Sequence, residues 1–316
     1  MTETLAPARL DPRKFRDPDV TAEGEPRARV ALTRLETLWF NTGTLCNLTC
    51  ANCYIESSPR NDRLVYLTAA EVSSFLDEIE RAGLGTREIG FTGGEPFMNP
   101  GILDMLGEVL DRGFECLVLT NAMRPMMKCG GELLRLRDDH GGRLGVRVSI
   151  DHYDPALHEE ERGPRSWAPM VEGLRWLSDS GFHVTAAGRT LWGGCEEELR
   201  AGFARLFADL GVRIDAGDPA QLVLFPEMDA AADVPEITGA CWEILGQSPD
   251  DVMCASSRMV VKRRGADAPV VLSCTLLPYD EAFEMGATLS EAWGPVKLNH
   301  PHCARFCVLG GAHCSA

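Results

Sequence analysis

The sequence predicts an α/β fold: a partial (β/α)6 barrel followed by a small, Cys-rich C-terminal domain. From about Leu35 to Phe225, short apolar runs alternate with amphipathic stretches. This alternation is typical of βαβ units around a parallel sheet. About six units are too few for a closed eight-fold barrel, so we expect an open one. After Phe225 the alternation stops, and five of the twelve cysteines follow within residues 254–314.

The elements of the barrel can be placed in order. The expected strands are Thr37–Phe40, Glu88–Phe91, Glu115–Thr120, Gly145–Ile150, His183–Ala187 and either Val212–Ile214 or Gln221–Phe225. The first expected helix begins at Thr68. Further helices are expected near Ile102–Asp111, Glu132–Asp138, Pro169–Asp179 and Glu196–Leu210. Thr68 and Glu71 have the spacing of a capping box. Glycine follows several of these helices, as is usual at a helix end.

Three segments follow from this pattern: an N-terminal extension at 1–35, the barrel at 36–228 and the Cys-rich domain at 229–316. Residues 1–35 are rich in Pro, Arg, Asp and Glu and show little periodicity. We therefore expect them to form an extension or a loosely docked arm.

Charge and composition exclude several classes of partner. The formal net charge of −16 repels nucleic-acid phosphates and anionic lipids, so we expect neither nucleic acid nor membrane as a partner. No apolar run approaches the roughly 18 to 20 residues that span a bilayer. The N-terminus lacks the features of a secretory signal, which favours a cytoplasmic location. In a reducing compartment, clustered cysteines are more often metal ligands than disulfides.

Cys46, Cys50 and Cys53 directly follow the first expected strand. Three thiolates can ligate three irons of a [4Fe–4S] cube and leave the fourth iron open. An open metal position is typical of a catalytic site. The alternative is a zinc knuckle, for which residues 41–60 supply no His and only Glu56 as an acidic ligand.

Short polar motifs end the next three strands. They are Thr92-Gly93-Gly94-Glu95-Pro96, Leu119-Thr120-Asn121 and Ser149-Ile150-Asp151. The two glycines allow close approach of the backbone to a ligand, and the carboxylate of Glu95 can accept from an ammonium. Because the carboxyl ends of barrel strands build the active site, we expect these motifs to meet the cysteines there.

Together these motifs resemble the radical S-adenosylmethionine (SAM) superfamily, whose C-x3-C-x2-C motif lies at this place in a TIM-like partial barrel. The resemblance implies a [4Fe–4S] cluster on Cys46, Cys50 and Cys53 that binds SAM at its open iron. One electron then cleaves SAM to methionine and a 5′-deoxyadenosyl radical, which abstracts a substrate hydrogen atom. A one-electron donor such as flavodoxin or ferredoxin is implied as a partner.

The resemblance also assigns residues to the SAM pocket. Gly93, Gly94, Glu95 and Pro96 correspond to the segment that contacts the methionine amino group. Thr120, Asn121, Ser149 and Asp151 match further strand-end segments of the family. Arg162 and Arg189 are alternative partners for the methionine carboxylate. Asn52 stands where the family often has an aromatic residue, and Tyr54 is the candidate to pack near the adenine in its place.

The second cysteine group resembles the SPASM or twitch auxiliary-cluster domains of this superfamily. The segment from Arg258 to Cys274 is expected to form a β-hairpin that brings Cys254 and Cys274 together. With Cys303 and Cys307, these residues are the preferred ligands of one auxiliary [4Fe–4S] cluster. Cys314 is the alternative for one of them. A structural zinc site using His302 or His313 is the competing interpretation.

Substrate and catalytic groups are less well defined by the sequence. Cys195, near the fifth strand, is a candidate hydrogen donor, and Glu227, after the sixth, a candidate acid or base. The segment at 1–35 is short for a peptide-recognition domain, which favours a small metabolite over a peptide or protein substrate. A non-catalytic iron–sulfur carrier is the alternative from another class, but it has no need of a nucleoside pocket.

Overall fold

A nine-stranded sheet in the order β10-β9-β8-β2-β3-β4-β5-β6-β7 organises the computed structural model, which describes residues 8–310. Strands β2 to β7 are parallel to their neighbours. Their bounds are Thr37–Asn41, Glu88–Thr92, Glu115–Thr120, Leu144–Asp151, His183–Arg189 and Leu222–Phe225. The predicted partial barrel is therefore confirmed. Of the two candidates for the sixth strand, the one near Gln221–Phe225 is correct.

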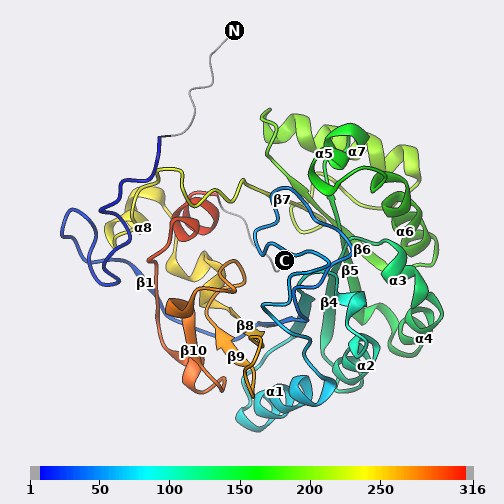
Figure 1. Cartoon of the computed structure of the whole chain (residues 1–316), viewed down its shortest axis with the longest axis horizontal. Coiled ribbons are helices and arrows are strands. Elements are labelled where there is room, and N and C mark those ends of the chain that lie inside the picture. Colours follow the sequence, from blue (N-terminus) through cyan, green and yellow to red (C-terminus); the bar gives the residue numbers. More distant parts are fainter. Residues whose placement is uncertain (1–7, 311–316) are drawn as a thin grey trace.

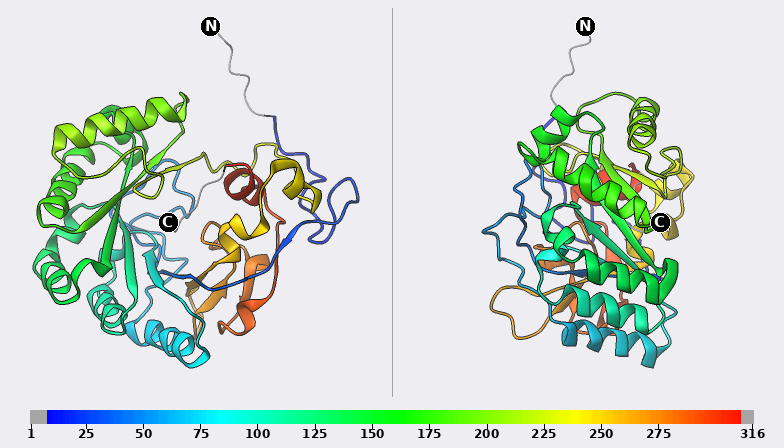
Figure 2. Two further views of the ribbon diagram at one scale, coloured as in Figure 1. Left: turned by 180° about the vertical axis from the view of Figure 1, so that it is seen from behind. Right: turned by 90° about the vertical axis from the view of Figure 1, so that its right-hand side faces the viewer.

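The barrel helices lie in an arc on the outer side of these strands (Figures 1 and 2). The predicted helices are α1 Ala69–Ala82, α2 Ile102–Asp111, α4 Gly130–His140, α6 Trp167–Asp179 and α7 Glu196–Leu210. Two short helices of the barrel were not predicted, α3 Arg124–Lys128 and α5 Pro155–Arg162. Each is too short, and α5 too polar, to show a helical period in the sequence.

Helix α1 illustrates how local sequence fixes the start of an element. The Thr68 hydroxyl accepts from the Glu71 backbone N–H at 3.2 Å, and the Glu71 carboxylate accepts from the Thr68 backbone N–H at 2.9 Å. This reciprocal pair is the predicted capping box. The helix ends at Gly83, whose φ of 60° is left-handed. Between these ends it buries one apolar face against the sheet.

The C-terminal region extends the barrel sheet. Strand β8 (Ser257–Val261) pairs in parallel with β2 and antiparallel with β9 (Val270–Leu272). Strand β10 (Glu284–Gly286) continues the antiparallel edge. The predicted hairpin is thus present. This region also contains α8 (Ala240–Leu245), β11 (Val296–Lys297), several short 3-10 turns and one π-helical turn at Cys303–Val308. The division at residue 228 stays a prediction.

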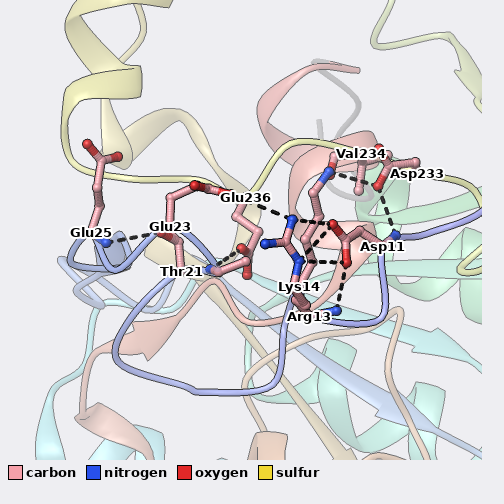
Figure 3. A network of polar contacts seen from close by, with 10 residues as sticks. Asp11, Arg13, Lys14, Thr21, Glu23, Glu25, Asp233, Val234 and Glu236 are labelled. Atoms are coloured by element: carbon pink, nitrogen blue, oxygen red, sulfur yellow. Dashed lines mark hydrogen bonds and ion pairs between the residues drawn. The ribbon is translucent and has the colours of Figure 1, made fainter.

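Residues 8–35 form an arm that packs on the C-terminal region near α8, on the side away from the barrel helices (Figures 1 and 2). Strand β1 (Arg29–Val30) pairs with β11. The Arg27 guanidinium donates to Glu236 at 2.6 Å, with side chains 0% and 5% exposed. Figure 3 shows the neighbouring polar contacts, among them Lys14 with Asp233 at 2.7 Å. The arm is therefore firmly docked by one buried charge pair, by further polar contacts and by the buried side chains of Val30 and Leu32.

In the part of the chain that the structure describes, none of the helices has the length and apolarity to cross a membrane.

Candidate functional site: a cavity at the strand ends

One cavity opens where the parallel strands end. It is lined by the three cysteines of the first group and by residues at the carboxyl ends of β3, β4, β5, β6 and β7. The predicted site residues on its wall are Cys46, Cys50, Cys53, Tyr54, Gly93, Gly94, Thr120, Asn121, Ser149, Asp151, Arg162 and Arg189. Segments that are far apart in the chain are thus brought together as expected. Glu95 and Pro96 are buried behind this wall.

The three thiols line the cavity, and those of Cys46 and Cys50 are largely withdrawn from water. Burial raises the pKa of Cys46 to about 12 and that of Cys50 to about 11. Without a metal, these groups therefore stay protonated near neutral pH, and a bound metal would supply the charge that deprotonates them. Three cysteines on one wall fit the three protein ligands of a cube with an open iron. Within residues 8–310, no three His, Cys, Asp or Glu side chains converge as closely as a single-ion site requires.

Gly93 and Gly94 hold the start of the loop that carries Cys46, Cys50 and Cys53, called here the cysteine loop. The Gly94 N–H donates to the Gly43 carbonyl at 2.8 Å, and the Glu95 N–H donates to the Leu45 carbonyl at 3.1 Å. A Cβ at Gly94 would lie 2.2 Å from the Leu45 carbonyl oxygen, and Gly93 has a φ of 137°. Only glycine fits here, because two backbone segments touch. The close approach thus serves the cysteine loop, while the predicted contact of these glycines with a ligand stays a prediction.

Asn52, between Cys50 and Cys53, is held by the carboxylate of Glu161. Its backbone N–H donates to Oε1 at 2.9 Å and its side-chain amide donates to Oε2 at 2.8 Å. The Arg189 guanidinium donates to the Asn52 carbonyl at 2.9 Å and pairs with Glu161 at 3.3 Å. We call these three residues the Asn52 latch. Glu161 was not predicted, because nothing in the run of glutamates at 159–161 marks which one points inward.

Arg162 is paired with Asp151 on the cavity wall. Its Nε donates to Oδ2 at 2.6 Å and its Nη2 to Oδ1 at 3.1 Å. Burial opposes the charge of Arg162, but attraction by Asp151 and Cys50 raises its pKa overall. Asp151 has a left-handed φ of 59°, a conformation that is strained for a non-glycine residue. The pairing orients both side chains before any ligand is present.

Glu95 ties two of the predicted motifs together. Its carboxylate accepts from the Thr120 hydroxyl at 2.8 Å, from the Asn121 N–H at 2.9 Å and from the Phe97 N–H at 3.2 Å. Burial raises the pKa of Glu95 to about 7, although these donors work in the opposite direction. The carboxylate thus changes charge near neutral pH.

An apolar wall lies in the same cavity and was not predicted. It consists of Phe225, Met228, Leu276 and Phe306, which come from β7, the following link and the C-terminal region. The rings of Phe225 and Phe306 stack at a centroid distance of 5.6 Å. No sequence signal could have joined these residues, because they lie in segments with no common period.

The second cysteine group lines a separate, smaller pocket. Cys254, Cys274, Cys303 and Cys307 meet there beside His302 and Leu276, and Leu276 also borders the first cavity. Burial raises the pKa of Cys254 to about 11 and lowers that of His302 to about 4. The four predicted ligands are therefore brought together. Cys314 and His313 lie outside the described residues, so their alternative roles stay predictions.

The two catalytic candidates are not brought to the cavity. Cys195 is exposed and immediately precedes α7. Glu227 is also exposed, on the link after β7. Neither is on the cavity wall. The strand-end position of these residues suggested a catalytic role, but both segments turn toward solvent.

Comparisons with known proteins agree with this geometry. The chain is 34% identical over 143 residues to the antilisterial bacteriocin subtilosin biosynthesis protein AlbA of Bacillus subtilis, a match covering 45% of this chain and 30% of AlbA. It is 28% identical over 144 residues to the AdoMet-dependent heme synthase of Nitratidesulfovibrio vulgaris, covering 43% and 35%. The chain thus spans about a third of the length of these curated relatives.

Among solved structures, SuiB of Streptococcus suis bound to the precursor peptide SuiA has a similar fold. Its TM-score is 0.58 at 12% identity, over 81% of this chain and 63% of SuiB. The family model of the radical SAM superfamily matches residues 40–206, which include the three cysteines and all the strand-end motifs. Members of this superfamily use a [4Fe–4S] cluster and SAM. The predicted resemblance is confirmed: this chain belongs to the radical SAM superfamily.

Proposed function

We propose that this chain is a radical SAM enzyme that acts on an apolar side chain of a peptide. Cys46, Cys50 and Cys53 would hold the SAM-binding cluster, and Cys254, Cys274, Cys303 and Cys307 a second one. When bound, the first cluster would supply, with one electron from an external donor, the reductive cleavage of SAM to methionine and a 5′-deoxyadenosyl group, which leaves as 5′-deoxyadenosine after taking a hydrogen atom from the substrate. The protein's own residues bind, orient and exclude water.

The apolar wall carries this proposal. Phe225, Met228, Leu276 and Phe306 share the cavity with the strand-end motifs. A side chain packed on this wall buries apolar surface, which contributes about 25 cal/mol per Å². It also displaces water from the reacting centre.

The charges of the cavity favour a substrate without strong negative charge. Both arginines on the wall are already paired, Arg162 with Asp151 and Arg189 with Glu161. A phosphorylated substrate needs cations that are free to face it, since anions are usually held by charge-assisted hydrogen bonds. An uncharged side chain makes no such demand.

Two relatives support a peptide as the bearer of this side chain. AlbA belongs to the biosynthesis of a bacteriocin, and SuiB has been crystallised with a precursor peptide. The expectation of a small-metabolite substrate is not confirmed. We therefore place the peptide first.

The test is anaerobic reconstitution with iron and sulfide, followed by dithionite and SAM. We expect 5′-deoxyadenosine above the level of a Cys46→Ala control, and no excess would overturn the radical SAM activity. Peptides encoded beside this gene, made with perdeuterated Leu, Phe or Tyr, should pass deuterium into 5′-deoxyadenosine. If only an unrelated small molecule transfers its hydrogen, the peptide assignment is wrong.

A further inference from the structure

Arg258, on β8, is a buried cation that pairs with no carboxylate of the described chain. Its side chain is among the most buried of the molecule, and the residue is 1% exposed. The guanidinium donates to the carbonyls of Cys254 at 2.7 Å, Ser257 at 2.8 Å and Ala292 at 2.9 Å, and more weakly to that of Gly294 at 3.3 Å. Its hydrogen bonds are thus satisfied, while its charge has no counter-ion within residues 8–310.

This arrangement differs from that of another buried arginine. Arg27 is equally enclosed, but Glu236 lies 2.6 Å away and cancels its charge. Neutral carbonyls satisfy N–H donors without cancelling charge, and an isolated charge is costly to bury. The cost at Arg258 calls for an anion that the polypeptide itself does not supply.

The pocket of the second cysteine group is the neighbouring place for such an anion. Arg258 binds the backbone of Cys254, whose side chain lines that pocket with Cys274, Cys303 and Cys307. The charged forms of Cys254 and Cys274 are the groups whose attraction is felt at Arg258. Four thiolates around an iron–sulfur core carry a net negative charge, so a loaded pocket would hold the missing counter-ion.

We propose that Arg258 is the built-in counter-charge of the metal–thiolate site formed by Cys254, Cys274, Cys303 and Cys307. The inference rests on the proposed second cluster. It assigns to Arg258 two effects: it favours retention of the cluster, and it raises the cluster's reduction potential, because a nearby positive charge stabilises the more negative, reduced state.

Three variants separate charge from hydrogen bonding. Arg258→Met removes the charge and the donors, whereas Arg258→Lys keeps the charge and loses the guanidinium fork. Arg27→Met is the matched control, because it removes a buried arginine that already has a carboxylate partner. All are made in a full chain carrying Cys46→Ala, Cys50→Ala and Cys53→Ala, so that only the second site binds iron.

The measurements are iron per chain, the rate of iron loss to a chelator and an EPR-monitored redox titration. For Arg258→Met we expect iron loss about tenfold faster and a more negative potential than in the parent. For Arg258→Lys we expect values near those of the parent. Arg27→Met should change the potential much less, because the charge of Arg27 is paired with Glu236 and its guanidinium reaches the pocket only through the Leu298 carbonyl at 3.4 Å.

The outcomes distinguish failure of the inference about Arg258 from failure of the proposed second cluster. If the parent binds no iron, the second cluster is absent, and the role of Arg258 is overturned with it. If the parent binds about four irons but Met and Lys behave alike, Arg258 is only a structural donor and the inference alone is wrong. Equal potentials in the parent and Arg258→Met would likewise overturn the inference alone.

Discussion

Phe225 and Phe306 stack with their ring planes 20° apart, which joins the last barrel strand to the π-helical turn at Cys303–Val308. Both rings line the cavity at the strand ends, and Phe306 also belongs to the turn that brings Cys303 and Cys307 to the second pocket. A change in either ring should therefore be felt at both sites.

Replacing Phe306 tests this double role. Because Phe306 is 1% exposed, Phe306→Ala leaves a cavity and should lower the free energy of unfolding by about 3 to 5 kcal/mol in urea. Phe306→Leu should cost less but still loosen iron bound at the second site. Phe207→Leu, an equally buried change in α7, is the control and should lower stability without changing iron retention. Equal iron loss in both Leu variants would contradict the link.

The Asn52 latch should be cooperative. Glu161 accepts from both the backbone and the amide of Asn52, so either Asn52→Ala or Glu161→Gln breaks much of the same contact. In a double-mutant cycle on the metal-free chain we expect a coupling of about 1 to 2 kcal/mol in unfolding free energy. Glu160→Gln, on the exposed side of α5, should show none. Additive effects of Asn52→Ala and Glu161→Gln would mean that the contact between these residues does not contribute to stability.

Gly94→Ala should block the first cluster site selectively. The added Cβ would meet the Leu45 carbonyl oxygen at 2.2 Å and push the cysteine loop out of place. We expect reconstituted chains to bind about half the iron of the wild type and to make no 5′-deoxyadenosine. Gly107→Ala on α2 has room, with its nearest atom at 3.7 Å, and should be neutral or slightly stabilising. Full iron content in Gly94→Ala would refute this account.

Glu95 should make stability depend on pH. Because burial raises its pKa from 4.5 to about 7, the folded chain favours the protonated carboxyl. The protonated carboxyl therefore contributes to the free energy of unfolding. This contribution, on the order of 3 kcal/mol, is fully present below pH 4.5 and is lost as pH rises through 7. Urea unfolding of the metal-free chain from pH 4.5 to 8 should show this fall in the free energy of unfolding. In Glu95→Gln the free energy of unfolding should depend less on pH over this range. The same pH dependence in the variant and the wild type would disprove the assignment.

Much of the fold was predictable because its signals are local. The Thr68 capping box, the glycine at residue 83 and the strand-end motifs each lie within a few residues of the chain. The sequence also predicted which cysteines meet, because the parallel strands deliver their carboxyl ends to one edge.

The features that the sequence did not predict depend on where the tertiary structure points each side chain. Glu161 sits among other charged residues and Arg258 lies next to an apolar run, and only the fold shows that both side chains turn inward. The apolar wall joins Phe225 to Phe306 across a domain-sized gap in sequence. Conversely, Cys195 follows the correct strand but turns away from the cavity. Type and spacing of residues identify a motif, while the path of the chain decides where each side chain points.

The parallel pairing of β2 with β8 has a consequence for how the chain folds. Thr37 lies opposite Ser257, so the first barrel strand has one of its two neighbours near the far end of the sequence. Such non-local pairing slows folding, because a long loop must close before the contact forms. During synthesis, β2 can pair with β3 early, but its other edge stays open until β8 emerges. We therefore expect chains halted before residue 257 to expose that edge and aggregate.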